Sequence, residues 1–558
     1  MPEFDVCIVG SGAGAAPIAA TLAAAGRRVV VLEKGPWLHE GDFFKDDRAL
    51  GARRAYKPRL RDEPHVLEDR AEDGGWQATP TWQSERDFWN GSAVGGATNF
   101  MSGMFHRMKP QDFKLRSIYG PIADATIADW PIDYDELEPY YALVEQEVGV
   151  SGRAIAHPHA EPRSTPDFPF PPTTEHLFAR RIDDAFSRAG LHPLPVARAI
   201  LPATVGERGG CSYSGYCGGY GCATGAKGSA RAALLTRAVA TGCCEIRPRA
   251  HVFRLVSDAS GRAIAAEYRD AVGGTRRVTA KVFVLACQAI ETCRLLLLSH
   301  SPRHPRGLAN GSDQVGRNLL FSATALGAGD FPLAEAPQAE RGALAAYGPF
   351  VNRALQDWYH IEDPAFDGPA KGGTLEFVLQ HPNALARAST LKWDENGRLL
   401  WGRELKARLE REFTGMRRLN FEVFADWLPH ADCHVRLDPA VTDRWGVPVA
   451  RVRLGFHPHN ARVTAFLAAR GEEALRLVGA GNVRSRVYDS PPPNLVAGGC
   501  RFGTDPSTSV LDPQCRAHEV DNLFISDASF MPTGGSVPYT WTVYANAFRV
   551  ARQVLATV

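Results

Sequence analysis

Glycines at a fixed spacing are the first residues of this chain that suggest chemistry. Gly10, Gly12 and Ala15 directly follow a β-prone run, and Glu33 ends the next such run. In a strand–turn–helix–strand unit, the first glycine permits a tight turn, the second lets the backbone approach a pyrophosphate, and a small third residue keeps the helix close to the strand. The helix N-terminus favours the phosphates, and the carboxylate accepts hydrogen bonds from ribose hydroxyls. The pattern predicts a dinucleotide site without choosing between NAD and FAD; a ligand-free, Gly/Ala-rich helix start is the alternative.

A cysteine-rich loop is the second candidate site. Cys211, Cys217 and Cys222 lie on one Gly-rich segment. Three thiolates brought together in this way can ligate an iron–sulfur cluster. Zinc normally takes a fourth ligand, and no nearby His supplies one. Because short cysteine runs are weak signals, we favour a structural role for the thiols, with iron–sulfur ligation as the alternative. We predict no other metal ligands.

The elements that must position these residues alternate between strands and helices. Phe4 to Val9 and Arg28 to Leu32 are β-prone and flank an Ala/Leu-rich helical segment. Near the C-terminus, a β-prone run from Leu523 to Ile525 precedes Asp527, whose carboxylate can cap the backbone at a helix start. A helix from Trp541 to Ala556 then follows. This order predicts an α/β nucleotide-binding fold.

Bulk composition favours a small-molecule partner. The 558 residues carry a formal net charge of +1, with 22% charged and 44% apolar residues. This balance gives no electrostatic reason to expect nucleic acid or an anionic membrane as partner. The N-terminal residues lack the features of a secretory signal, and the longest apolar stretch, Ala13 to Ala25, is too short to span a bilayer. We therefore expect a cytoplasmic location, no membrane span and no nucleic-acid partner.

Further segments give the chain a resemblance to a known family. A second Gly-rich turn runs from Asn90 to Asn99, and characteristic segments follow at Val315–Leu319, Leu437–Pro448 and Gly498–Pro506. With these segments the chain resembles the glucose–methanol–choline (GMC) oxidoreductases over nearly its whole length, and bacterial sugar and glycoside dehydrogenases most of all. The resemblance implies an FAD-dependent dehydrogenase or oxidase. In such an enzyme, hydride passes to flavin N5 from a CH–OH carbon of a sugar, glycoside or other alcohol.

The same resemblance assigns roles to particular residues. The first glycine turn and Glu33 would meet the ADP half of FAD. The ribityl and isoalloxazine half would be met by the second turn and the C-terminal acid, that is, by Gly95, Gly96, Asn99 and Asp527. Some relatives attach FAD covalently through a His in the second turn. Phe100 stands at that position here, so we expect FAD to be bound non-covalently.

The resemblance also implies an α/β fold with a Rossmann-like FAD-binding domain and an antiparallel-sheet substrate domain. We expect the FAD-binding domain to comprise residues 1–320 and 480–558, and the substrate domain to comprise mainly 325–465, with contributions from 40–90 and 150–200. Alternating runs at 434–437 and 449–454 predict a half-exposed antiparallel sheet. We expect that sheet to form the floor of the substrate pocket.

Two positions depart from the family pattern. Leu495 stands where most relatives carry the His that takes the hydroxyl proton. Pro538 stands where a second His or Asn is usual, and a register one residue off would put Val537 there instead. None of these side chains can accept a proton. Tyr539 is the nearest replacement, because a neighbouring charge can lower the pKa of a phenol; packing against flavin or substrate is the alternative role. The other candidates are histidines, namely His360, His381, His457 and His459.

The missing pair leaves three interpretations of the reaction. The first, which we favour, is ordinary alcohol oxidation with another base. The second is α,β-dehydrogenation of a carbonyl compound, in which a Tyr and an oxyanion-stabilising partner would act. The third is a catalytically reduced FAD-binding protein, which the intact cofactor motifs disfavour. The sequence identifies neither the substrate nor the electron acceptor, for which oxygen, a quinone and a redox protein are the options.

Overall fold

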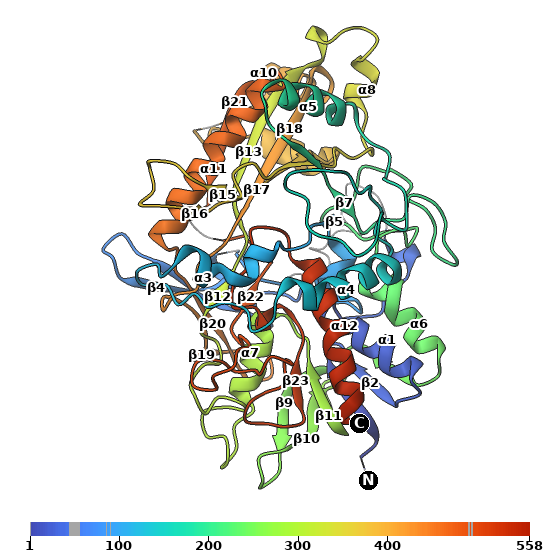
Figure 1. The fold of residues 1–558 in the computed structure, drawn as a ribbon, viewed down its shortest axis with the longest axis vertical. Helices are drawn as coiled ribbons and strands as arrows, with labels where there is room; N and C mark the ends of the chain where they lie inside the picture. The colour runs from blue at the N-terminus through green and yellow to red at the C-terminus, as the bar shows by residue number, and fades with distance from the viewer. Residues whose placement is uncertain are drawn as a thin grey trace.

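The lower half of the molecule in Figure 1 is built on a largely parallel sheet. The computed structural model describes residues 2–43, 56–84, 86–89, 91–394, 396–488, 491–492 and 495–558, so Asn90, at the start of the second Gly-rich turn, lies outside the described residues. The strand order is β8-β2-β1-β11-β10-β9, and β23 also pairs with β11. The strands are β1 (Phe4–Val9), β2 (Val29–Leu32), β8 (Cys244–Arg247), β9 (His251–Ser257), β10 (Ala263–Arg269), β11 (Thr275–Leu285) and β23 (Leu523–Ile525).

Five of these strands run parallel, because β1 pairs with β2 and β11, β2 pairs with β8, and β11 pairs with β23 in that sense. Strands β9 and β10 are antiparallel to their neighbours. The predicted strands at both ends of the chain are therefore confirmed and lie in one sheet. Parallel strands bring their carboxyl ends to one edge, which is where open α/β sheets bind ligands.

Helices cover this sheet and join the two ends of the chain. Helix α1 (Ala16–Ala24) packs against α12 (Thr540–Thr557), and α12 packs against α4 (Tyr134–Val144). The buried face of α1 carries the small residues Ala16, Ala19 and Ala23, which allows close packing against its neighbours. Figure 1 shows α1 and α12 side by side near both termini. The predicted C-terminal helix is confirmed.

A second, six-stranded antiparallel sheet forms the upper half of the molecule in Figure 1. Its order is β21-β13-β18-β17-β14-β6. The strands are β6 (Pro193–Pro195), β13 (Ala323–Pro332), β14 (Arg353–Leu355), β17 (Gly373–Leu379), β18 (Met416–Ala425) and β21 (Gly481–Val487). Helix α11 (Pro458–Leu477) covers one face of the sheet, where Leu419, Phe421 and Val423 of β18 are buried in a separate hydrophobic core. The alternate residues of β18 point to the opposite face.

A third, four-stranded sheet corrects one expectation. The alternating runs at 434–437 and 449–454 do form an antiparallel pair, β19 (Cys433–Thr442) with β20 (Pro448–Leu454), as predicted. This pair joins β3 (Val66–Arg70) and β4 (Trp76–Pro80). Within the described residues, however, neither β19 nor β20 lines the main cavity. The prediction that they form the floor of a substrate pocket is wrong, because period-two alternation identifies a half-exposed strand but not the element that faces it.

The remaining elements are short and connect these layers. The helices are α2 (Thr81–Ser84), α3 (Leu115–Tyr119), α5 (Leu177–Arg188), α6 (Thr236–Ala240), α7 (Ala289–Leu298), α8 (Arg341–Ala345), α9 (Ala384–Leu391) and α10 (Gly402–Glu410). The strands are β5 (Met104–Phe105), β7 (Ala197–Arg198), β12 (Leu319–Leu320), β15 (His360–Ile361), β16 (Ala370–Lys371) and β22 (Ala497–Gly498). Among the helices described, none has the length and apolar character needed to cross a bilayer.

Candidate active site

A cavity of about 760 Å³ opens at the carboxyl edge of the parallel sheet. The residues that follow β1, β2, β11 and β23 all line it, and residues of β17 and β18 line its other side. Its volume lies within the range of small-molecule and cofactor sites. The cavity therefore joins the two large sheets and is the candidate active site.

The first Gly-rich turn forms one end of this cavity. Gly10 has φ +93°, and a Cβ at that position would lie 2.2 Å from the Ala286 carbonyl oxygen, so only glycine fits there. Gly12 differs, since a Cβ there would meet no atom within 4 Å, and the residue lines the cavity. No side chain caps the N-terminus of α1, and its first turn carries no acidic residue. The partial positive charge of this helix end thus faces the cavity, and no acidic or capping side chain of the helix neutralises it.

Glu33 lies at the same end, directly after β2. Its carboxylate accepts hydrogen bonds from the Ser11 hydroxyl (2.5 Å) and from the Gly35 N–H (2.8 Å). Burial raises the pKa of Glu33, although these two donors act in the opposite direction. The Ser11 hydroxyl oxygen in turn accepts from the Gly95 N–H at 3.0 Å. The acid is thereby fixed in place and lines the cavity.

The second Gly-rich turn packs directly on the first. A Cβ on Gly96 would lie 3.3 Å from the Gly12 Cα. Gly96 lines the cavity, whereas Gly95, Asn99 and Ala15 lie behind its lining. The Asn99 amide nitrogen donates to the carbonyls of Val94 and Gly96 and so holds the turn, while Ala15 is fully buried at the start of α1.

Asp527 lies beyond β23, at the carboxyl edge of the sheet. It caps the short turn Ala528–Phe530 by accepting from the Ser529 N–H at 2.9 Å, so the expected capping role is confirmed. The Thr292 hydroxyl donates to its other oxygen at 2.5 Å. Burial raises the pKa of Asp527 against these donors. The carboxylate reaches the cavity from the C-terminal segment of the chain.

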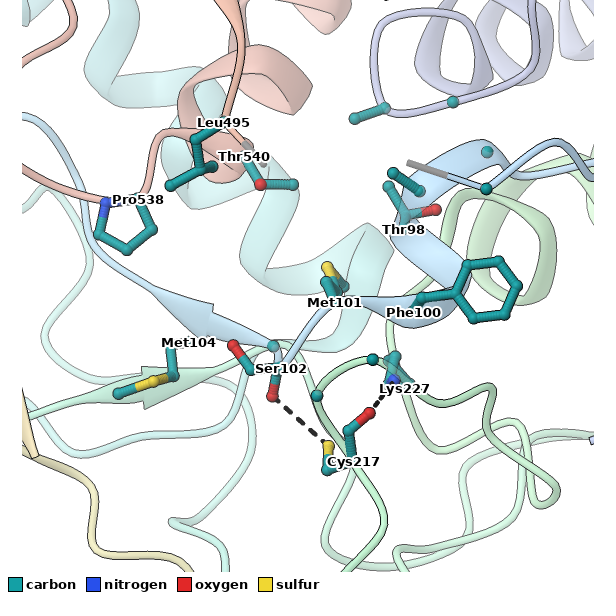
Figure 2. Close-up of a pocket in the computed structure, with 18 of the residues that line it drawn as sticks. Thr98, Phe100, Met101, Ser102, Met104, Cys217, Lys227, Leu495, Pro538 and Thr540 are labelled. Atoms are coloured by element: carbon teal, nitrogen blue, oxygen red, sulfur yellow. Dashed lines mark hydrogen bonds between the residues drawn. The ribbon is translucent and has the colours of Figure 1, made fainter. Parts of the chain in front are cut away.

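Leu495, Pro538 and Tyr539 line the cavity together, although they are distant in sequence. Pro493 and Asn494, which precede Leu495, lie outside the described residues. Figure 2 shows Leu495, Pro538 and Thr540 on one wall and Met101 on the other. The Tyr539 hydroxyl donates a hydrogen bond to the Leu495 carbonyl. Burial, and then the charge of Asp426, raise the pKa of Tyr539 well above its ordinary value.

Two carboxylates on the six-stranded sheet face the cavity from the opposite side. Glu376 of β17 and Glu422 of β18 are direct cross-strand partners, and both line the cavity. His106 Nε2 lies 2.7 Å from Glu376 Oε1. Glu422 makes no side-chain hydrogen bond or ion pair within the part of the chain that the structure describes. Burial, and then the Glu376 charge, raise the pKa of Glu422 to about 7.

Sequence reasoning missed this pair. The alternating run at 417–424 could have revealed a strand with one polar face, but the pairing of Glu376 with Glu422 depends on the register of β17 against β18.

The four candidate histidines are dispersed. Of these four, only His381 lines the cavity. Its Nδ1 lies 2.6 Å from the Gly215 carbonyl oxygen. His360 is exposed beside Glu362, with Nε2 3.2 Å from its carboxylate. His457 caps α11, and His459 lies near it at the start of that helix.

The cysteine loop lies along the cavity, and Cys211, Cys217 and Cys222 all line it. Burial raises the pKa of Cys211 to about 11. Burial opposes ionisation of Cys222 too, but the nearby Lys227 ammonium and the hydrogen bonds from Lys227 and Thr224 together lower the pKa of that thiol. Within the described residues, the three thiols do not meet the 4.8 Å mutual spacing of a single-ion site. Iron–sulfur ligation stays an untested alternative, since a cluster of several irons spaces its thiolates more widely.

A buried lysine joins this loop to the second Gly-rich turn. The Lys227 ammonium donates to the carbonyls of Asn99, Cys217 and Tyr220 at 3.2, 3.1 and 2.7 Å. Figure 2 shows Lys227 and Cys217 beneath the turn, with the Cys217 thiol directed to Ser102. Lys227 therefore positions the cavity wall.

The fold and the site define a class of protein. Family models described as GMC oxidoreductase match residues 198–322 and 429–547. The 6'''-hydroxyparomomycin C oxidase of Streptomyces lividus is 30% identical over 558 residues, which cover 99% of this chain and 91% of that protein. The chain belongs to the GMC oxidoreductase family, as its resemblance predicted, and is an oxidoreductase.

A second relative supports this assignment, and a solved structure shares the fold. The paromamine 6'-oxidase of Streptomyces fradiae is 30% identical over 555 residues, with 99% of this chain and 91% of that protein covered. The crystal structure of pyridoxine 4-oxidase from Mesorbium loti superposes with a TM-score of 0.59 at 20% identity, covering 99% of both chains. The latter similarity shows the fold alone.

The sheet end of the cavity fits FAD, the cofactor that members of this family generally bind. The uncapped N-terminus of α1 suits a pyrophosphate, and the space above Gly12 admits it. Glu33 offers a fixed carboxylate for ribose hydroxyls, and Asp527 offers a second one further along the cavity.

Proposed function

We propose that this chain is an FAD-dependent oxidoreductase that oxidises a CH–OH group of a small, polyhydroxylated substrate. The observation that carries the proposal is one cavity that joins the dinucleotide turn to the carboxylate-bearing wall of β17 and β18. Bound FAD would supply the acceptor for hydride from the substrate carbon. Anaerobic titration of the yellow holoprotein with sugars and glycosides tests this, because a matching substrate bleaches the flavin absorbance.

Binding of FAD is assigned to the sheet edge. Gly10, Gly12 and Glu33 would hold the ADP half, and Gly96 and Asp527 the remainder. Asn99, Gly95 and Ala15 would act indirectly, because they shape the turns behind the cavity lining. We also propose the division into an FAD-binding domain of residues 1–320 and 480–558 and a substrate domain of mainly 325–465, with contributions from 40–90 and 150–200. Strand β21 (Gly481–Val487) is a correction to these bounds, because it pairs with β13 in the six-stranded sheet and therefore falls in the substrate domain.

Glu422 is our candidate for the proton acceptor that Leu495 and Pro538 do not provide. A general base works best when its pKa lies near the operating pH, and the pKa of about 7 at Glu422 meets that condition. Tyr539 is less suited, because its hydroxyl already donates to a carbonyl and its pKa is raised. With Glu422 as acceptor, alcohol oxidation would not require the family's usual His.

Hydrogen-bonding groups on the wall favour a polar substrate. Asn420, Glu422 and Glu376 present amide and carboxylate oxygens to the cavity. Such acceptors pair with the hydroxyl groups of sugars and with amino groups. The names of the two Streptomyces relatives specify oxidation of hydroxyparomomycin and of paromamine, which agrees with this class.

Replacement of Tyr539 by Phe is expected to change the rate of anaerobic flavin reduction by less than about tenfold, since a positioned acid or base would contribute about 10²- to 10⁴-fold. The lost hydrogen bond to the Leu495 carbonyl should appear instead as a lower melting temperature. Stopped-flow reduction and thermal unfolding measure the two effects. A rate loss of two orders of magnitude would return the proton-transfer role to Tyr539.

FAD is expected to be bound non-covalently. Phe100, at the position of the attachment His of some relatives, packs against Phe43 and Tyr56 and has no atom able to form that bond. Acid precipitation of the holoprotein should release the whole yellow chromophore into the supernatant. A coloured pellet would contradict this expectation.

A further inference from the structure

A cluster of imidazoles and one carboxylate lies on the surface, outside the cavity. Ligand atoms of His159, His192 and Asp357 all lie within 4.8 Å of one another. The Asp357 Oδ1 is 2.7 Å from His192 Nδ1 and 3.9 Å from His159 Nε2. The Asp357 side chain is 11% exposed and the His192 side chain 50% exposed, so the cluster is open to solvent on one side.

The fold itself brings two of these residues together. Strand β6 pairs with β14, and Leu355 lies opposite Pro193. His192 directly precedes β6 and Asp357 lies just beyond β14, so the ends of the two strands place them side by side. The His192 N–H donates to both Asp357 oxygens, at 3.1 and 3.3 Å. The carboxylate is thereby oriented by the backbone.

Two further residues orient His159. The His157 Nδ1 accepts from the backbone N–H of His159 at 3.1 Å, so the ring proton of His157 lies on its Nε2. That Nε2 is 3.2 Å from the His192 carbonyl oxygen. Lys109 donates to the His159 carbonyl and lies 3.0 Å from the Glu161 carboxylate. His157 therefore bridges the two ligand-bearing segments. Such outer contacts are what holds a metal-binding His in place.

We propose that His159, His192 and Asp357 bind a divalent transition-metal ion of the zinc type. Two imidazole nitrogens and one carboxylate oxygen form a donor set that suits zinc, with water as the fourth ligand, and that hard ions such as Mg²⁺ do not prefer. Tetrahedral coordination at about 2.0–2.1 Å requires ligand atoms about 3.3 Å apart. The measured 2.7 and 3.9 Å lie on either side of that value, so small side-chain rotations complete the site.

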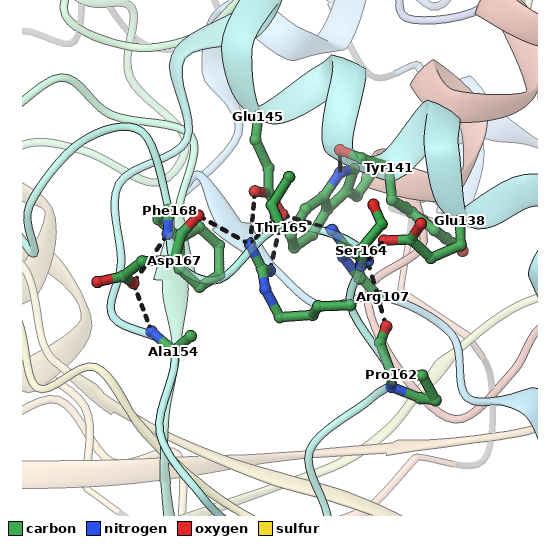
Figure 3. Close-up of polar contacts among 12 residues, drawn as sticks. Arg107, Glu138, Tyr141, Glu145, Ala154, Pro162, Ser164, Thr165, Asp167 and Phe168 are labelled. Atoms are coloured by element: carbon green, nitrogen blue, oxygen red, sulfur yellow. Dashed lines mark hydrogen bonds and ion pairs between the residues drawn. The ribbon is translucent and has the colours of Figure 1, made fainter.

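The ion would fasten the loop of residues 152–170 to the substrate-side sheet. The inner part of this loop is already held by a buried network, shown in Figure 3. Arg107 binds Glu138 and Glu145, both at 2.8 Å, and Arg163 binds Glu145 at 2.7 Å. The outer part, with His157 and His159, lies against His192 and Asp357. Because none of the three proposed ligands lines the cavity, the role of the metal is structural rather than catalytic.

Zinc binding to the tag-free holoprotein tests the proposal. After chelator treatment, equilibrium dialysis should load one zinc ion per chain. His159→Ala and Asp357→Asn should lose that ion, whereas His157→Ala should weaken its binding about 10- to 100-fold, the usual cost of an outer partner. His300→Ala, which changes an exposed His elsewhere, should bind zinc as the wild type does. Zinc should also raise the melting temperature of the wild type and not that of His159→Ala.

Two results would overturn this site. One is a wild-type protein that binds no zinc at micromolar concentrations. The other is zinc that stays bound in His159→Ala but is lost in Cys217→Ser, which would move the metal to the cysteine loop. Flavin content is measured on every variant. Loss of zinc with unchanged flavin content concerns the metal site alone and leaves the proposed oxidoreductase activity untouched.

Discussion

Glu422→Gln is expected to lower the rate of anaerobic flavin reduction by about two to four orders of magnitude, the usual contribution of a positioned base. Gln keeps the size and hydrogen-bonding capacity of the side chain but accepts no proton. Glu422 lines the cavity and makes no ion pair among the described residues. The variant should therefore fold and bind FAD as the wild type does. Stopped-flow absorbance with a reducing sugar or glycoside measures the rate.

The pH dependence of the flavin reduction rate tests the same role of Glu422. The ionised carboxylate is the active form, and burial beside Glu376 raises its pKa to about 7. The reduction rate of the wild type should therefore be low at acidic pH and increase as pH rises through about 7. Glu422→Gln should flatten this part of the profile.

A neighbouring substitution supplies the matched control. Asn420 lies two residues away on the same face of β18 and also lines the cavity. Asn420→Ala should weaken substrate binding without removing the pH-dependent step. If Glu422→Gln reduces its flavin as fast as the wild type, the base lies elsewhere, and His381, the one cavity-lining residue among the four candidate histidines, becomes the next to replace.

The dinucleotide end of the site could be predicted because its determinants are local. The tight turn at Gly10, the open position at Gly12 and the acid at Glu33 all lie within one strand–helix–strand unit, whose geometry fixes their relative positions. Asp527 could be placed only through the family resemblance, since its strand, β23, joins the sheet from the far end of the chain.

The substrate side could not be derived in the same way. Glu376 and Glu422 meet because β17 pairs with β18 in one register, and a shift of one residue would put them on opposite faces of the sheet. The site of His159, His192 and Asp357 likewise depends on β6 pairing with β14. Long-range strand pairing leaves no local sequence pattern. The sequence therefore showed that the usual catalytic His is replaced by Leu495, but not which side chain could take over its role.

Gly12→Val should abolish FAD retention while leaving the fold intact. The residue lacks the left-handed backbone of Gly10, and a Cβ there would meet no protein atom within 4 Å. The added side chain would instead fill the space beside the N-terminus of α1, where a pyrophosphate would be held. Loss of two charge-assisted hydrogen bonds, each worth about 1.5–3 kcal/mol, would weaken binding by more than about a hundredfold.

Flavin absorbance per chain, measured after gel filtration, reports this loss, and circular dichroism confirms the fold. Gly342→Val is the matched control, because Gly342 also has open space at its Cβ position but lies on the exposed helix α8. It should keep its full flavin content. Gly10→Ala provides the opposite contrast, since its Cβ would lie 2.2 Å from the Ala286 carbonyl oxygen and should disrupt folding itself. A folded Gly12→Val protein with full flavin occupancy would place the cofactor away from this turn, because no pyrophosphate could share the space that the valine fills.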